Sequence, residues 1–309
     1  MHDWTVNDMP DLSGRLAVVT GGGAGLGLAT SGELARARAE VVIAGRDAAR
    51  IQVAADRIAA RHPGARVRTE LLDLASLASV RDFAARLHGQ GRPLDLLVNN
   101  AGVLNIPQRT LTEDGFELTL ATNHLGHFAL TGRLLPLLLR GDSPRVVTVC
   151  STTVRVPTLD LTDLMSERNY RPITAYARSK LAALMFAVEL QHRAGRRLTS
   201  VAVNPGRAFT GLDRHSHTRI QELGRHLDRI LGQPFERAAA VILYAATAPS
   251  VVPGGFYAAS GFLGKRGTPK PIQPPRQVRD RTATRDLWLK SEALTGVRPS
   301  FPSRAPTAG

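Results

Sequence analysis

The sequence predicts an α/β fold in which a mostly parallel, doubly wound sheet of seven strands carries helices on both faces. Short apolar runs alternate with helical patterns along the chain, at spacings that suit strand–helix–strand crossovers. No internal repeat and no linker divides the sequence. We therefore expect all 309 residues to form a single domain, with residues 262–309 as a basic C-terminal extension.

Seven apolar runs are predicted to be strands because they are short and rich in β-branched residues. They span residues 16–20, 41–45, 67–72, 94–98, 145–150, 199–203 and 255–258. Helical patterns fill most of the intervals and span residues 28–37, 48–61, 116–139 and 174–194. A last helix is expected at residues 284–294, docked on the body through Leu287, Trp288 and Leu294.

The composition indicates a globular protein of a reducing compartment. Hydrophobic residues make up 43% of the chain, which is enough for a substantial core. The only cysteine, Cys150, excludes an internal disulfide framework. The first ten residues are polar, unlike a signal peptide, and no apolar run reaches the roughly 18 residues of a membrane span. We expect a cytoplasmic protein with no membrane span.

The formal net charge of +14 raises the question of a nucleic-acid partner. Residues 262–309 hold ten Lys or Arg against three Asp or Glu, which is half of the total charge. The other arginines are scattered over predicted helical faces, as is usual for a solvated surface. No nucleic-acid-binding motif accompanies them, so we expect no specific nucleic-acid partner.

A glycine-rich loop at residues 21–27 joins the first predicted strand to the first predicted helix. Glycines let the backbone approach an anion closely, and a helix N-terminus supplies free N–H groups and a partial positive charge. A flexible turn would also be rich in glycine. The position between a strand and a helix favours a phosphate site.

Arg46 follows the second predicted strand, where a dinucleotide fold recognises the adenosine ribose. An arginine at this position accommodates the 2′-phosphate of NADP, whereas an acidic residue binds the free 2′-hydroxyl of NAD. Asp47 comes next and has two interpretations: it caps the following helix, or it reaches the ribose. The fork geometry of Arg46 favours NADP(H) over NAD(H).

Polar or small residues follow the other predicted strands, where they would line the crevice of an open parallel sheet. They are Asp73-Leu74, Asn99-Asn100-Ala101-Gly102, Ser151 and Asn204-Pro205-Gly206. Asn123 lies inside the helical pattern of residues 116–139, where a buried amide needs hydrogen-bond partners. Such a residue is more often structural than catalytic.

Tyr176 and Lys180 lie four residues apart in a predicted helix and therefore on one face of it. A phenol is a poor acid near neutral pH, with an ordinary pKa of roughly 10. A nearby ammonium favours the phenolate and lowers this pKa. The pair could move a proton to or from a carbonyl or alcohol, although the pattern alone is more typical of a surface pair.

Taken in order, these motifs resemble those of the short-chain dehydrogenase/reductase family over residues 12–261. Within the family, the chain is similar to a branch of retinol dehydrogenase-like bacterial oxidoreductases. The matching stretches include residues 123–128 and the tail at residues 287–296. The family motifs are Thr20-Gly21-Gly22-Gly23-Ala24-Gly25-Leu26-Gly27, Asn99-Asn100-Ala101-Gly102, Asn123, Ser151, Tyr176 with Lys180, and Pro205-Gly206-Arg207-Ala208-Phe209-Thr210.

The resemblance implies a Rossmann-type fold and a catalytic set of Asn123, Ser151, Tyr176 and Lys180. Tyr176 would be the general acid or base, Lys180 would lower its pKa and bind the nicotinamide ribose, and Ser151 would bind the substrate oxygen. Asn123 would help a water connect Lys180 to solvent. The implied cofactor contacts are Thr20, Gly21, Gly23, Ala24, Gly25, Leu26, Gly27, Arg46, Asp73, Leu74, Asn100, Ala101, Gly102, Tyr176, Lys180, Pro205, Gly206 and Thr210.

The sequence departs from the family pattern at three places. Gly22 and Gly23 replace polar residues of the loop, and Cys150 replaces the first serine of a common pair. Arg38 stands where many members have a glycine before the second strand. A helix end there often requires a left-handed residue, so the turn is expected to differ.

The most favoured function is an NADP(H)-dependent oxidoreductase of the ketoreductase or alcohol dehydrogenase type. Its substrate would be a carbonyl or secondary alcohol of an apolar small molecule. The alternatives are a non-redox enzyme of the same fold, doing cyclisation or isomerisation, and a nucleotide-binding sensor. The residues that suggest an apolar pocket could instead pack a loop onto the body; they are Leu159, Leu161, Leu164, Met165, Phe209 and Leu212.

Two further features of the sequence concern metals and assembly. His215, His217 and His226 lack a carboxylate or cysteine that would complete a persuasive metal site, so no metal is expected. Apolar faces around Leu134 and residues 181–190 suit either a homodimer or homotetramer interface or the core of the chain itself.

Overall fold

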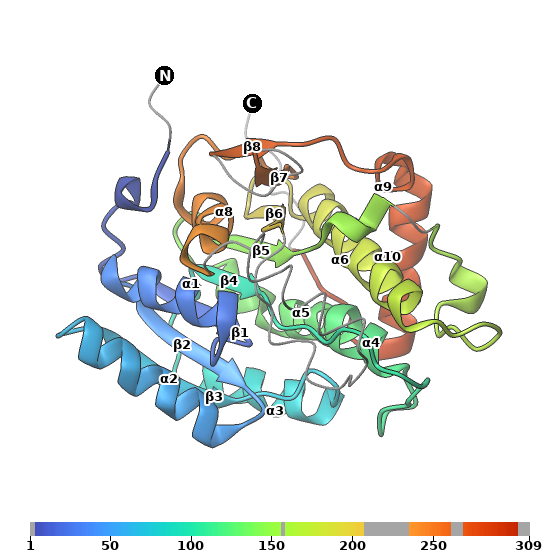
Figure 1. The fold of residues 1–309 in the computed structure, drawn as a ribbon, viewed down its shortest axis with the longest axis horizontal. Coiled ribbons are helices and arrows are strands. Elements are labelled where there is room, and N and C mark those ends of the chain that lie inside the picture. The colour runs from blue at the N-terminus through green and yellow to red at the C-terminus, as the bar shows by residue number, and fades with distance from the viewer. Residues whose placement is uncertain (1–3, 156–157, 207–234, 261–267, 302–309) are drawn as a thin grey trace, which may run out of the picture.

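The computed structural model describes residues 4–155, 158–206, 235–260 and 268–301. Within them, one eight-stranded sheet has the strand order β3-β2-β1-β4-β5-β6-β7-β8 (Figure 1). The mostly parallel sheet predicted from the sequence is confirmed, with one strand more than expected. Its strands are β1 (Leu16–Thr20), β2 (Glu40–Gly45), β3 (Arg66–Leu71), β4 (Leu96–Asn99), β5 (Arg145–Val149), β6 (Thr199–Asn204), β7 (Phe256–Ala259) and β8 (Pro269–Pro271).

The chain changes direction across the sheet at β1, which creates the crevice that positions the site. Strand β1 pairs in parallel with both β2 and β4, so that Val19 lies opposite Ile43 on one side and Val98 on the other. From β1 the chain continues to β2 and β3 on one side of the sheet, and it then crosses to β4 on the other side. In open α/β sheets, ligands bind at such a switch point, at the carboxyl ends of the strands.

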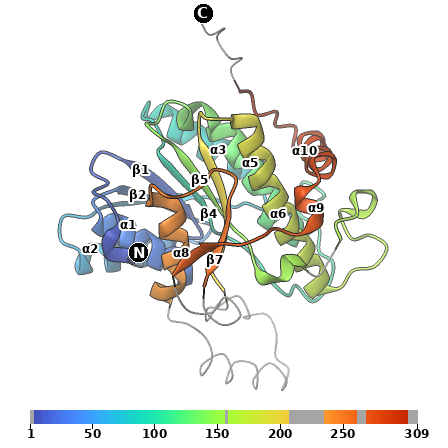
Figure 2. The same cartoon turned by 90° about the horizontal axis from the view of Figure 1, so that it is seen from above.

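Helices cover both faces of the sheet, because successive strand residues point to opposite sides. Ala17 and Val19 of β1 face the layer of α1, α2 and α8, whereas Leu16 and Val18 face that of α3, α5 and α6. Figure 2 shows the sheet between these two layers. The helices are α1 (Gly25–Arg36), α2 (Ala48–Arg61), α3 (Leu77–Gly89), α5 (Gly126–Leu138), α6 (Pro172–Ala194) and α8 (Phe235–Thr247).

The long helical pattern of residues 116–139 is not one regular helix. A short helix, α4 (Leu118–Leu120), leads into a π-helical turn, η2 (Ala121–Leu125), before α5 begins at Gly126. At Gly126, any side chain would collide with the carbonyl oxygen of Leu74. A π-turn adds one residue to the helical repeat and is frequent at functional sites. Here it carries Asn123.

Short 3₁₀ turns complete the N-terminal and central parts of the fold. They are η1 (Val6–Asp8), η3 (Thr152–Arg155) and η4 (Leu161–Asp163). Arg38, at the end of α1, has a positive φ of 72° and pairs with Asp11. The turn therefore keeps the left-handed geometry that glycine usually provides, and the expectation that it would differ is wrong.

The C-terminal segment packs onto the body of the protein. Strand β8 extends the sheet edge antiparallel to β7, and the helices α9 (Arg276–Arg279) and α10 (Arg281–Thr295) follow. In Figure 2, both helices lie beside α6. Trp288 of α10 stacks on Phe186 with ring centroids 5.9 Å apart, and the Arg193 guanidinium lies 4.5 Å from the Trp288 ring. The docked helix predicted around Trp288 is confirmed.

The apolar helix faces and the length of the helices bear on possible interfaces and membrane spans. Leu134 and Leu181 are fully buried among residues of the same chain, so their apolar character is explained by its own core. No helix in the described part of the chain is long and apolar enough to cross a membrane.

Candidate active site

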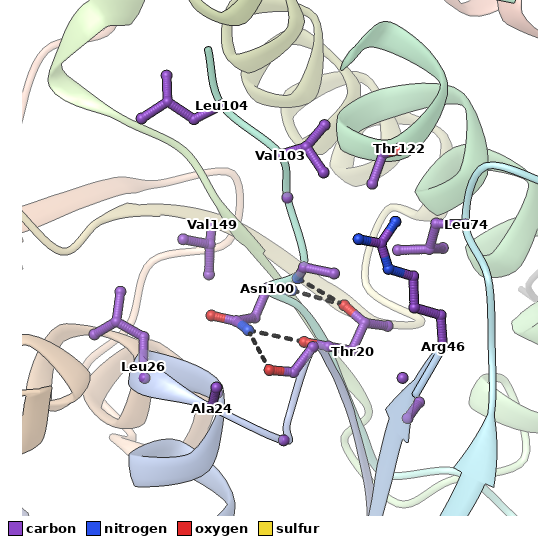
Figure 3. Close-up of a pocket in the computed structure, with 18 of the residues that line it drawn as sticks. Thr20, Ala24, Leu26, Arg46, Leu74, Asn100, Val103, Leu104, Thr122 and Val149 are labelled. Atoms are coloured by element: carbon purple, nitrogen blue, oxygen red, sulfur yellow. Dashed lines mark hydrogen bonds between the residues drawn. The ribbon is translucent and has the colours of Figure 1, made fainter. Parts of the chain in front are cut away.

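A cavity of about 640 Å³ opens at the carboxyl ends of the central strands. Its walls come from the β1–α1 loop and from the ends of β2, β3, β4, β5 and β6 (Figure 3). The volume is within the usual range for small-molecule and cofactor sites. Every cofactor-contact residue predicted from the sequence lines it, except Thr210, which lies outside the described residues. Their contacts with a cofactor stay a prediction.

The glycine loop forms the floor of this cavity. Gly21 has a φ of 66°, and a Cβ built on it would lie 2.9 Å from the Cα of Ala101. A side chain at Gly27 would collide with the carbonyl of Gly21. Helix α1 begins at Gly25, and its N-cap, Ala24, provides no side-chain hydrogen bond to the first N–H groups. These N–H groups and the missing side chains fit the pyrophosphate of a dinucleotide.

Thr20 connects the glycine loop to the turn after β4. Its hydroxyl oxygen accepts hydrogen bonds from the N–H groups of Asn100 and Ala101, at 2.9 and 3.0 Å. The side-chain amide of Asn100 in turn donates to the Thr20 carbonyl at 2.8 Å (Figure 3). Thr20 is completely buried. It therefore shapes the cavity by joining two of its walls.

The end of β2 brings two arginines to the cavity. Figure 3 shows Arg46 reaching in from this strand, and Arg50 lines the same wall from the first turn of α2. Neither guanidinium forms an ion pair with any described residue. Asp47 caps α2 by accepting the Arg50 N–H at 3.0 Å. Of the two interpretations of Asp47, the structure shows the helix cap.

Asp73, expected near the adenine, also has a local role. One of its carboxylate oxygens accepts the Ala75 N–H at 2.9 Å, and its own N–H donates to Ser79 at 2.9 Å. These bonds shape the β3–α3 connection at the cavity wall. Among the described residues, the second carboxylate oxygen of Asp73 has no hydrogen-bond donor, and Asp73 lines the cavity.

Tyr176, Lys180 and Ser151 meet at the end of β5 and line the cavity together. The second turn of α6 presents Tyr176, and Pro172 at the start of the helix is suited to a helix N-terminus. The Lys180 ammonium is almost fully buried and donates to the carbonyl of Val149 at 2.9 Å. Because burial disfavours the charged form, the pKa of Lys180 is lowered.

The pKa of Tyr176 is raised, not lowered as expected from its neighbour Lys180. Burial is the largest effect and raises this pKa, while a hydrogen bond with Ser151 acts in the opposite direction. Lys180 directs its ammonium to the Val149 carbonyl, so it offers Tyr176 less stabilisation of a phenolate than the sequence suggested. In this structure, Tyr176 is a neutral phenol, the form that donates a proton.

Asn123 lies behind the cavity wall rather than in it. Its amide oxygen accepts the Val103 N–H at 2.8 Å, and its amide nitrogen donates to the Val103 carbonyl at 3.0 Å and to Ser179 at 2.9 Å. A Cβ on Gly102 would lie 3.1 Å from the Asn123 oxygen and 3.3 Å from the Lys180 nitrogen. The side chain of Asn123 thus holds Val103 and Ser179, and Gly102 lets it approach Lys180. Its part in a proton relay stays a prediction.

Several expected residues do not reach the cavity. Leu159 and Leu164 are buried in a core cluster with Leu181, and neither they nor Leu161 and Met165 line the cavity. The interpretation of these residues as loop packing is therefore the one the structure supports. Phe209, Leu212 and the three histidines His215, His217 and His226 lie outside the described residues. Within the described ones, no group of His, Cys, Asp or Glu could hold a metal ion.

Sequence reasoning missed other residues of the site. Val103, Leu104 and Ile106 form the apolar wall beyond the glycine loop. They follow the motif Asn99-Asn100-Ala101-Gly102, but their own spacing in the sequence indicates no site. His127 lies in the stretch of residues 123–128 that resembles the family. Its spacing of four residues from Asn123 places both on one helical face and could have indicated a contact between them. Burial raises the pKa of Cys150 to about 12, so this residue is an inert thiol.

Comparisons with known proteins identify the family of the chain. The family profile described as short chain dehydrogenase matches residues 15–220. A polyprenol dehydrogenase of Mus musculus is 42% identical over 296 residues, which cover 94% of this chain and 86% of that protein. Retinol dehydrogenase 14 of Mus musculus is 36% identical over 302 residues, covering 93% and 87%.

A crystal structure of an uncharacterised protein from Mycobacterium paratuberculosis is similar along the whole fold. The TM-score is 0.79 at 36% identity, with 97% of this chain and 100% of that chain covered. The profile match spans about two thirds of the chain, and the relatives are similar over nearly all of it. The chain therefore belongs to the short-chain dehydrogenase/reductase family, with retinol dehydrogenase-like relatives.

Proposed function

We propose that this protein is an NADP(H)-dependent oxidoreductase that interconverts an alcohol and a carbonyl on an apolar small molecule. One observation carries the proposal: Ser151, Tyr176 and Lys180 share a single cavity with the glycine loop. When bound, the nicotinamide supplies or accepts the hydride. The chain's own residues bind and orient the substrate and move its proton.

The three polar side chains have separate roles in this proposal. Ser151, hydrogen-bonded to Tyr176, donates to the substrate oxygen and orients it. In the reductive direction, the Tyr176 phenol donates its proton to this oxygen; in the oxidative direction, the phenolate removes the alcohol proton. Lys180, held by the Val149 carbonyl, places a positive charge where a phenolate would develop. Asn123 positions the helix that bears Tyr176 through its bond to Ser179.

The preference for NADP(H) rests on the charges at the end of β2. Arg46 and Arg50 both line the cavity, and one oxygen of the Asp47 carboxylate caps α2. These two guanidinium groups, which pair with no described residue, favour a phosphate at this wall, because charge-assisted bonds to a dianion are stronger than bonds to a hydroxyl. A free carboxylate would favour the unphosphorylated ribose.

The substrate is proposed to be an apolar alcohol or aldehyde of the isoprenoid type. Val103, Leu104 and Ile106 provide an apolar wall next to Tyr176. Two relatives are named for polyprenol and retinol, which are apolar primary alcohols. The substrate class therefore extends from the carbonyls and secondary alcohols expected from the sequence to primary alcohols. The cytoplasmic location and the oligomeric state stay predictions.

Cofactor oxidation with defined substrates tests the reaction. NADPH absorbance should fall when the protein is mixed with retinaldehyde or a short polyprenal. Tyr176→Phe should lower the turnover by at least about 100-fold, which is typical for loss of a general acid, and keep its NADPH affinity. Tyr244→Phe is the control, because this hydroxyl bonds to Ser250 away from the cavity. Unchanged turnover in Tyr176→Phe would remove Tyr176 as the proton donor, and cofactor binding without oxidation across the panel would favour a non-redox role.

Binding titrations test the cofactor preference. Arg46→Glu should weaken NADPH binding by about 10- to 100-fold, because one charged hydrogen bond is worth about 1.5–3 kcal/mol. It should change NADH binding much less. Arg57→Glu changes the same charge on the exposed face of α2 and should affect neither cofactor. An equal loss for NADPH and NADH in Arg46→Glu would contradict the assignment of the 2′-phosphate to this wall.

A further inference from the structure

His127 is a buried residue at the start of α5 that the proposed chemistry does not use. It is 2% exposed and lies one turn after Asn123. Its ring lies between two parts of the site: Nε2 is 2.9 Å from the hydroxyl of Thr20, and Nδ1 is 3.3 Å from the backbone carbonyl of Asn123. The ring thus spans from the glycine loop to the π-turn.

The hydrogen-bond partners determine which ring nitrogen carries the proton. The Asn123 carbonyl is an acceptor only, so Nδ1 must donate to it. At the other end, the Thr20 oxygen already accepts two backbone N–H groups, from Asn100 and Ala101. The Thr20 hydroxyl can therefore only donate one further hydrogen bond, either to His127 Nε2 at 2.9 Å or to the Val98 carbonyl at 3.3 Å. Both ends agree on a neutral ring protonated at Nδ1.

The surroundings of His127 keep the ring neutral. The pKa of His127 is lowered to about 3, first by burial and then by the Lys180 ammonium. The bond to the Asn123 carbonyl acts in the opposite direction, and the nearby His124 adds to the lowering. A cationic ring would need a donor at Nε2 as well, and the Thr20 oxygen has no lone pair left to accept it. The same arrangement therefore disfavours the charged ring both through its hydrogen bonds and electrostatically.

We propose that His127 is a positioning residue that fixes the cofactor-binding wall and the π-turn of Asn123 relative to each other. Its Nε2 end holds Thr20, and through Thr20 the turn of Asn100 and Ala101. Its Nδ1 end holds the backbone of Asn123, whose side chain in turn holds Val103 and α6. The two ends are therefore separable: one sets the cofactor pocket, and the other sets the proton-transfer groups. This division between an effect on cofactor binding and an effect on proton transfer rests on the proposed function.

Amide substitutions can test the two ends one at a time. The Asn side-chain nitrogen can take the place of Nδ1, so His127→Asn keeps the bond to Asn123 and loses that to Thr20. His127→Gln reaches the place of Nε2, so it keeps Thr20 and loses the Asn123 carbonyl. We expect His127→Asn to weaken NADPH binding about tenfold with kcat within about twofold, and His127→Gln to do the reverse.

Two controls separate positioning from general stability. Thr20→Val removes the hydroxyl from the other end of the same bond, together with its bonds to Asn100 and Ala101. The double variant of Thr20→Val and His127→Asn should therefore lose no more NADPH affinity than Thr20→Val alone. His124→Gln replaces a ring that is equally buried but bonded to Ser291; it should lower the stability without separating kcat from cofactor affinity. Equal losses in His127→Asn and His127→Gln would overturn the proposal.

An NMR measurement on the unaltered protein does not depend on activity. The ring nitrogens of His127, assigned by comparison with His127→Gln, should show the Nδ1–H tautomer with no titration between pH 8 and pH 5. An Nε2–H tautomer, or titration in this range, would overturn the bridge itself. The expected tautomer in a protein that bound no NADPH would leave the bridge in place and refute the proposed function instead.

Discussion

Acidification should destabilise this protein well above the pH at which its carboxylates titrate. His124 and His127 are both fully buried, and burial lowers the pKa of each to about 3. In the unfolded chain, each ring returns to its ordinary pKa of about 6.5. Above pH 6.5, neither state binds the proton, so no stability is lost. Below it, the unfolded chain takes up protons that the folded chain cannot, and the free energy of unfolding falls.

The size of this effect follows from the two pKa values. At pH 5, the unfolded state gains about 2 kcal/mol for each ring, and the folded state gains almost nothing. The two rings together remove about 4 kcal/mol between pH 8 and pH 5, which is a large part of the 5–15 kcal/mol that stabilises a typical domain. Below about pH 3, the loss levels off, because the folded state then binds the protons as well.

Urea unfolding at pH 8, 6.5 and 5 measures the effect. In His124→Gln and in His127→Gln, the difference between pH 8 and pH 5 should shrink by about 2 kcal/mol, whatever the absolute stability of the variant. His192→Gln is the control: its pKa is also lowered, first by burial, but a third of the side chain is exposed. A pH dependence that survives in the double variant of His124 and His127 would refute the reasoning.

Three substitutions at special backbone positions give further expectations. Arg38→Gly should be more stable than Arg38→Ala by about 1 kcal/mol in urea unfolding, because both lose the same ion pair and only glycine suits the φ of 72°; equal stabilities would contradict this. Gly102→Ala should fold but lose about tenfold in kcat, because its methyl group would displace Asn123; unchanged kinetics would show that this approach is unimportant. Gly126→Ala should lower the stability by about 1–3 kcal/mol, measured by thermal unfolding, because of the collision with Leu74; an unchanged Tm would show that the loop yields.

The fold was predictable because its signals are local and repeated. A buried parallel strand is a short apolar run, and six such runs lie within two residues of the observed strand limits from β1 to β6. Strand β8 was missed because two of its three residues are prolines, which lack the N–H group and are typical of edge strands. The π-turn was missed because one extra residue in a helical repeat does not change its overall apolar pattern.

The site was predictable as a set of residues but not as a set of interactions. The glycine loop and the Tyr176–Lys180 pair have fixed spacings, so they could be found in the sequence. The orientation of Asp47 and the partners of Asn123 depend on contacts between segments far apart in the chain. The direction of the Tyr176 pKa likewise depends on burial. None of these has a signature at the level of sequence spacing.

The neutral histidines and the buried ammonium belong to one electrostatic arrangement. The amine of Lys180 lies where little water solvates it, and this burial lowers its pKa. A second positive charge on His127 would raise the cost of that ammonium further, since the two groups interact. A neutral ring can bridge Thr20 and Asn123 without this cost, whereas Lys or Arg in its place could not. The acid sensitivity predicted above is thus caused first by the burial of the two rings, and the positive charge of Lys180 adds to it at His127. A variant without the His127 ring should lose less unfolding free energy between pH 8 and pH 5. It should also lose the alignment of the cofactor wall with the proton-transfer groups.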